Sequence, residues 1–213
     1  MTTSDLPGND TAPGVEATVE LTAELEDFSQ QIADSVASFL LALREIARGD
    51  DGSRAISLLL LEISQVLLAG ARLGVQQDFT PGSEHQPDVG PEADLDGMRL
   101  RLAEMLGNVD TYTFVFDPYV PEVVASQLSD DLTSIASDLE NGLRHFRAGD
   151  VMEALWWWQF SYVASWGNLA GAALNALLSV VAHYRLDTDA PVDEEELLAV
   201  ADEILESVDP ESR

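Results

Sequence analysis

Apolar side chains recur every three or four residues over most of this chain, and this period constrains the fold more than any other feature. Such a period places the apolar residues on one face of an α-helix, and that face must then be buried. The pattern predicts helices over about 24–48, 53–76, 96–106 and 129–148. Gly49 and Gly149 stand where a glycine ends a helix. Asp51 or Ser53 stands where a polar side chain caps the next helix.

A fifth helix is predicted from Val151, and it contains all four tryptophans. It is expected to continue to about Tyr184 or to break near Gly167. Two of its faces are apolar along their length, which predicts a central, largely buried helix. One face runs through Leu155, Trp158, Tyr162 and Trp166, and the other runs through Met152, Trp156, Phe160 and Val163.

The third face of this helix is small and polar, apart from Trp157. Small residues allow another helix or a ligand to approach the backbone closely. One interpretation is tight helix packing, with Asn168 and Asn175 hydrogen-bonded to neighbouring helices. The alternative is a binding groove with a partly exposed Trp157 at its mouth. The candidate binding residues are Trp157, Ser161, Asn168 and Asn175, with Arg72 and Arg144 as contacts for an anion.

Residues 112–121 alternate aromatic and small side chains and contain Pro118 and Pro121. A single strand cannot form a sheet, so we expect an extended segment laid over the helices. Residues 1–19 predict a disordered acidic tail. Residues 187–213 predict an acidic segment with a short amphipathic helix. The fold class that follows is all-α, with a single bundle of about six helices over residues 20–186 around the Trp-rich helix.

No catalytic, metal-binding or nucleotide-binding motif in the chain rises above background. Cysteine is absent, which excludes disulfides, a cysteine nucleophile and cysteine-based metal sites. Lysine is absent too, so a Gly-x-x-x-x-Gly-Lys phosphate loop is excluded. The three histidines are isolated, and Glu-x-x-Glu/Asp pairs lie only in acid-rich end segments, where they arise by chance. We therefore predict no catalytic residues, no metal and no cofactor, and we favour a non-catalytic role while leaving an enzyme open as an alternative.

The formal net charge is −29, from 39 acidic and 10 basic residues. This charge opposes binding to nucleic acids and to anionic membranes, and it favours a basic protein partner. Residues 1–27, 78–96 and 187–213 together contain 24 of the 39 acidic residues, so the acid is concentrated outside the helical body. The apolar run 151–181 is interrupted by polar residues, which argues against a membrane span. No secretory signal is recognisable, and we expect a cytoplasmic protein.

Two resemblances add to these predictions. Arg147-Ala-Gly-Asp-Val-Met-Glu-Ala-Leu-Trp156 resembles the turn of a tetratricopeptide repeat, which predicts one helical hairpin but no repeat array. Over about Phe28–Leu186 the chain resembles a family of uncharacterised actinobacterial proteins with a domain of unknown function. The residues that carry this match are 60–74, Val115-Phe-Asp-Pro-Tyr119, 135–149 and Glu153-Ala-Leu-Trp-Trp-Trp-Gln-Phe-Ser-Tyr162. The resemblance implies one helical domain and no known activity.

Three functions remain open from the sequence. The first is a non-catalytic interaction or adaptor protein, for which a homo-oligomer is compatible with everything above. The second is a small-molecule-binding protein or enzyme that uses a cleft beside the Trp-rich helix. The third is an acidic decoy that mimics DNA, although a rigid mimic needs acidic residues spread over ordered helices.

Overall fold

The computed structural model describes residues 13–49, 51–81, 89–91 and 93–186 of the chain. Helices dominate this part of the molecule. They are α1 (Pro13–Ile46), α2 (Gly52–Gly74), α3 (Asp96–Leu106), α4 (Leu128–Ala148), α5 (Val151–Ser161) and α6 (Gly167–Leu186). A short 3₁₀ turn, η1 (Gly107–Val109), follows α3, and a π-helical turn, η2 (Tyr162–Trp166), joins α5 to α6.

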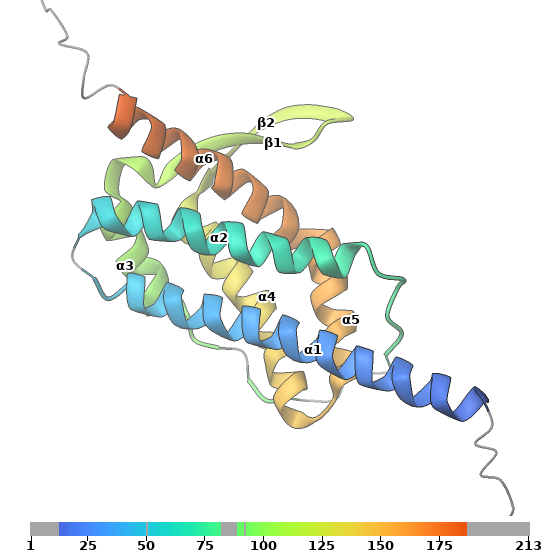
Figure 1. Ribbon diagram of the computed structural model, residues 1–213. Coiled ribbons are helices and arrows are strands. Elements are labelled where there is room, and N and C mark those ends of the chain that lie inside the picture. The colour runs from blue at the N-terminus through green and yellow to red at the C-terminus, as the bar shows by residue number, and fades with distance from the viewer. Residues whose placement is uncertain (1–12, 50, 82–88, 92, 187–213) are drawn as a thin grey trace, which may run out of the picture.

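The helices pack in two layers with an apolar core between them. In Figure 1, α1, α2 and α6 run side by side across the front, and α3, α4 and α5 lie behind them. The buried core draws on every helix and includes Phe39, Leu59, Leu132, Trp158 and Trp166. The predicted helical hairpin is formed by α4 and α5, which pack against each other across the Gly149 turn.

The helix boundaries follow the local signals in the sequence. The Asp51 side chain caps α2 by accepting a hydrogen bond from the Arg54 N–H, as predicted. Gly149 ends α4 in the left-handed conformation with φ of 91°, which is also confirmed. The start of α1 differs, because the helix begins at Pro13 rather than near residue 24. Proline is favoured in a first helical turn, since its missing N–H would have no helical partner there.

The prediction of a purely helical bundle is wrong in one respect, since the chain contains a β-hairpin. Strands β1 (Thr111–Asp117) and β2 (Val120–Gln127) pair antiparallel as a two-stranded sheet. The turn lies at Pro118 and Tyr119, and the Tyr119 N–H donates to the Asp117 carboxylate at 2.8 Å. The register leaves Pro121 and Glu122 opposite a single residue of β1, which is a β-bulge. Proline suits this position because it has no N–H for the ladder.

The Trp-rich segment forms one rod of 36 residues from Val151 to Leu186. It does not break near Gly167, but the π-turn η2 inserts one extra residue just before that glycine. The prediction that both apolar faces are buried is wrong for part of the second one, on which Met152 and Trp156 are half-buried. Phe160 and Val163 are exposed, because no other described element covers this side of α5.

The Arg54–Gly74 and Val151–Leu186 helices are long and apolar enough to cross a membrane by length and composition alone. Both also contribute buried side chains to the core. Of the predicted N-terminal tail, residues 13–19 belong to α1 and residues 1–12 lie outside the described residues. The predicted amphipathic helix near the C-terminus lies outside them as well.

Candidate functional site

The β-hairpin carries an unusual amount of exposed apolar surface. Six of its large apolar side chains are exposed, with exposed fractions from 41% at Val124 to 94% at Tyr119. The other four are Val115, Phe116, Val120 and Val123. The hairpin extends beyond the helices in Figure 1. Val115 and Val123 lie on one face of the sheet, and Phe116 and Val124 lie on the other. Both faces therefore carry exposed apolar side chains of the kind that mark docking places.

A ladder of aromatic rings runs along β1. Tyr112 and Phe114 stack with their ring centroids 5.6 Å apart, and Phe116 follows Phe114 at 6.4 Å. Tyr112 and Phe114 are half-buried, whereas Phe116 is exposed. The ladder therefore leads from the body of the protein out to the tip of the hairpin.

A groove of about 370 Å³ lies between β1 and α6. Its wall on the β1 side is formed by residues 113–116, and α6 contributes Gly167, Asn168, Gly171, Ala172 and Asn175. None of these residues is charged. The space beside Gly171 is open, since a Cβ atom added there would meet no heavy atom within 4 Å. The small residues of α6 thus let a ligand come close to the helix backbone, while aromatic rings flank it on the other side.

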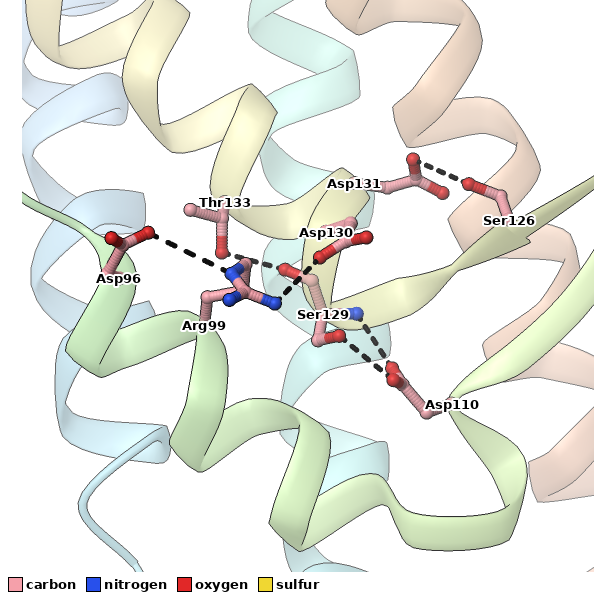
Figure 2. Close-up of polar contacts among 8 residues, drawn as sticks. All are labelled: Asp96, Arg99, Asp110, Ser126, Ser129, Asp130, Asp131 and Thr133. Atoms are coloured by element: carbon pink, nitrogen blue, oxygen red, sulfur yellow. Dashed lines mark hydrogen bonds and ion pairs between the residues drawn. The ribbon is translucent and has the colours of Figure 1, made fainter.

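The root of the hairpin is fastened to the first turn of α4 (Figure 2). The Asp110 carboxylate accepts hydrogen bonds from the Ser129 N–H at 2.8 Å and from the Ser129 hydroxyl at 2.9 Å. The Asp110 carbonyl accepts from the Leu128 N–H at 2.8 Å. The first N–H groups of a helix have no partner within the helix, so Asp110 caps α4 from a distant part of the chain.

A second carboxylate fastens both strands at once. Asp131 is buried in α4 and accepts hydrogen bonds from the Tyr112 hydroxyl at 2.6 Å and from the Ser126 hydroxyl at 2.9 Å. Burial raises the pKa of the Asp131 carboxyl above its ordinary range, although the two hydrogen bonds act in the opposite direction. Burial and the contact with Asp131 also raise the pKa of the Tyr112 hydroxyl. Every carboxylate oxygen of Asp110 and Asp131 accepts a hydrogen bond from the protein. We call this cluster the clamp, because it fastens the hairpin to the start of α4.

One ion pair joins α3 to the same end of α4. The Arg99 guanidinium lies 3.3 Å from the Asp130 carboxylate and 3.9 Å from that of Asp96 (Figure 2). Thr133 donates its hydroxyl hydrogen to the Ser129 carbonyl at 2.7 Å. Of these contacts, the partly exposed Arg99–Asp130 pair holds α3 against α4, beside the clamp that positions the hairpin.

Two of the predicted binding residues lie in the groove, and two do not. Asn168 and Asn175 line it with their exposed side chains, as the groove interpretation of the third helix face predicts. Trp157 is half-buried, and its indole N–H donates to the Asp138 carbonyl at 2.7 Å, so it packs against α4. Ser161 is buried and donates to the Trp157 carbonyl at 2.6 Å. The π-turn explains this division, because it rotates α6 relative to α5.

The two predicted anion contacts have structural roles elsewhere. Arg144 donates to the carbonyls of Gly90 and Pro91, and so it fastens the loop before α3. Arg72 donates to the Gln31 amide oxygen at 2.6 Å, and its guanidinium lies over the Phe28 ring at 5.4 Å. Neither residue lines the groove.

The described residues offer no constellation for catalysis elsewhere. They contain no group of three His, Cys, Asp or Glu side chains that could hold a metal ion. His145 is buried, and burial lowers its pKa, so it is neutral at physiological pH. A hollow of about 670 Å³ between the α1–α2 turn and α3 is lined by Arg48, Arg101 and Glu104, but it contains no buried polar group aimed at a ligand.

A small aromatic patch lies at the other end of the Trp-rich rod. Trp156 and Phe160 stack on each other with ring centroids 5.4 Å apart, beside a shallow pocket of about 280 Å³ next to Phe79. Gln159 fixes this region, since its side-chain N–H donates to the Leu73 carbonyl at 3.0 Å and its oxygen accepts from the Phe79 N–H at 2.9 Å. Phe160 remains about half exposed, at 53%, but the pocket is shallow and no unpartnered buried polar group of the described residues points into it.

Comparison with known proteins identifies a family but no activity. A family model described as "Domain of unknown function (DUF5063)" matches residues 23–183. The crystal structure of protein BF1032 from Bacteroides fragilis is similar, with a TM-score of 0.57 and 20% sequence identity. That similarity covers 70% of this chain and 89% of the other. At such identity the likeness shows the fold alone. No curated protein matches the chain.

Proposed function

This chain belongs to the DUF5063 family, whose function is unknown, and from its surface we propose that it is a non-catalytic interaction protein. It binds an extended, uncharged segment of a partner protein in the groove between β1 and α6. The observation that carries the proposal is the exposed apolar hairpin that forms one wall of that groove. Family membership confirms the resemblance expected from the sequence, but it says nothing about what the groove binds.

The hairpin supplies the backbone groups that an extended peptide needs. The sheet has two strands among the described residues, so each strand has an outer edge without a neighbouring strand. Such an edge presents N–H and C=O groups in a row, and an added strand pairs with them. Proline, charged residues and β-bulges protect an edge from such pairing. Pro121, Glu122 and the bulge protect β2, whereas β1 has no proline and only Asp117 as a charge. The edge of β1 is therefore the one open to an added strand.

The opposite wall supplies hydrogen bonds without charge. Asn168 and Asn175 are seven positions apart on one face of α6, about 10 Å along the helix axis. Each side-chain amide can donate to a carbonyl and accept from an N–H of a bound backbone. An extended peptide advances about 3.3 Å per residue, so the two amides would contact backbone groups three residues apart. Its apolar side chains would then pack on Phe114 and Phe116.

The alternatives have weaker support. An enzyme or small-molecule binder beside Trp157 would need that indole at the mouth of a cleft, and its N–H instead contacts α4. A DNA mimic would need a rigid, continuous row of acidic side chains, but on α1 the acidic cluster of residues 24–27 is followed only by Asp34 and Glu45. The basic partner predicted from net charge and the cytoplasmic location stay predictions.

A selection of random 12-residue peptides displayed on phage, with the full chain as bait, tests the proposal. The expected outcome is a set of uncharged sequences rich in β-branched and aromatic residues. Binding of a selected peptide is then measured by fluorescence polarisation. Val115→Asp should weaken it at least about tenfold, which is 1.4 kcal/mol, because it places a charge in the groove wall.

The matched control is Leu41→Asp on α1, which changes a similarly exposed side chain far from the groove. It should leave the affinity unchanged. The double substitution Asn168→Ala and Asn175→Ala should weaken binding without altering the thermal stability, because both side chains are exposed. Failure to select any peptide, or equal binding to the Val115→Asp and Leu41→Asp variants, would refute the proposed function.

A further inference from the structure

The outer face of α2 carries a regular stripe of exposed small and apolar residues. Its members are spaced alternately by four and three positions, which keeps them on one side of the helix. The three large members have exposed fractions of 51% (Leu61), 66% (Leu68) and 81% (Val75). The complete stripe is Ser57, Leu61, Ser64, Leu68, Ala71 and Val75, and all six residues are exposed.

This stripe lacks charge in a chain whose net charge is −29. The only charged residues of α2 are Arg54, Glu62 and Arg72, and none of them belongs to the stripe. Two copies of so acidic a chain repel each other over most approaches. They can meet without repulsion only where acidic side chains are missing, and the α2 stripe is such a place.

The spacing of the stripe is symmetric about its centre. Read from either end, the steps are four, three, four, three and four. A second α2 helix running antiparallel therefore meets the first in register. In that register Leu61 lies opposite Ala71, Leu68 opposite Ser64, and Val75 opposite Ser57. Each pair combines a large residue with a small one, which is the arrangement by which helix faces interdigitate.

Charges at the ends of the stripe complement one another in the same register. Arg54 lies one turn before Ser57, and Asp78 follows Val75 in the loop after α2. Both are exposed. In an antiparallel pair, the Arg54 end of one copy approaches the Asp78 end of the other, once at each end. The contact is thus self-complementary about a two-fold axis, as closed dimers require.

We propose that α2 packs antiparallel against α2 of a second copy of this chain, so that the protein is a homodimer. The inference is separate from the proposed function, because no residue of α2 lines the groove between β1 and α6. The proposed contact therefore uses different residues from those that line the groove.

Engineered cysteines test the arrangement cleanly, since the chain contains no cysteine. Ser57→Cys and Val75→Cys are prepared as separate proteins and oxidised mildly, alone and as a mixture. In the antiparallel dimer, equal positions lie about 27 Å apart along the helix, too far for a disulfide. Each variant alone should stay uncross-linked, and the mixture should yield a covalent dimer. Cross-linking of either variant with itself would overturn the proposal.

Sedimentation equilibrium tests the dimer without any cross-link. The wild-type chain should sediment as a dimer, and Leu68→Asp should raise its dimer dissociation constant at least about 100-fold, because the substitution buries two unpaired carboxylates. Leu41→Asp on α1 is the control and should leave it unchanged. A wild-type chain that is monomeric at every concentration would overturn the proposal. So would a monomer that binds phosphatidylcholine vesicles through Leu68, since a bilayer would then be the occupant.

Discussion

Replacing Asp110 by alanine should destabilise the protein by about 2–3 kcal/mol, more than its position in a turn suggests. Its carboxylate accepts two hydrogen bonds, from the N–H and the hydroxyl of Ser129, at 2.8 and 2.9 Å. Both residues are buried, with exposed fractions of 4% and 1%. Alanine therefore leaves two donors without partners in a place that water does not reach.

The magnitude follows from these contacts. A buried donor left without a partner costs about 1–3 kcal/mol, and loss of a helix N-cap costs about 1 kcal/mol in typical cases. The N-cap figure already includes one of the two lost bonds. Removal of a buried carboxylate recovers part of its desolvation cost, which brings the sum down to about 2–3 kcal/mol. For a chain of this length, such a loss lowers Tm by roughly 4–12 °C.

Urea unfolding followed by tryptophan fluorescence and by circular dichroism measures the effect. Asp110→Asn should cost no more than about 1 kcal/mol, because the amide oxygen still accepts from the Ser129 N–H. Asp94→Ala removes a comparable but exposed contact, at 3.3 Å to the Asp96 N–H, and should cost less than about 0.5 kcal/mol. If Asp110→Ala were no more destabilising than Asp94→Ala, the account of α4 capping given above would be wrong.

Four further substitutions probe packing and pH. Gly142→Ala should destabilise the protein by about 1–3 kcal/mol, because the added Cβ would overlap the Trp158 indole. Gly171→Ala adds its Cβ in open space and should stabilise the protein by up to about 1 kcal/mol. Thermal unfolding of the two variants measures this difference. The folded state holds the pKa of Asp131 above its ordinary 3.8. The contribution of Asp131 to stability therefore falls as the pH rises from 3.8 toward the higher pKa of the folded state. Asp131→Asn should flatten this decline, measured by urea unfolding between about pH 3 and 7. The folded state lowers the pKa of His145 below its ordinary 6.5. Stability should therefore fall as the pH drops below 6.5, because the unfolded chain then binds the proton more readily. His145→Gln should remove this loss of stability.

Local signals in the sequence predicted most of the helical framework. The cap at Asp51 and the left-handed glycine at Gly149 act within one turn of the helix ends that they define, so the sequence shows them directly. The family resemblance was likewise carried by contiguous segments, and the match over residues 23–183 confirms it. The hairpin escaped prediction because β2 was not recognised. Its Val123 and Val124 beside Pro121 look like a loop until β1 is placed opposite.

The groove depended on contacts that the sequence does not reveal. Periodicity showed that the Trp-rich segment had two apolar faces, but only the packing shows that Phe160 and Val163 stay exposed. The helical wheel placed Asn168 and Trp157 on one face, and the π-turn between them separates the two. The clamp at Asp110 joins residues 19 positions apart, a distance over which capping cannot be recognised by spacing.

The π-turn η2 also affects how other members of the family should be aligned to this chain. Insertion of one residue into a helix turns everything after it by about 100°, so residues 162–166 determine which side of α6 faces the hairpin. A relative that is one residue shorter there would keep both halves of the rod but direct different side chains toward β1. A single-residue gap in that short window would therefore distinguish members that have the asparagine-lined groove from members that lack it.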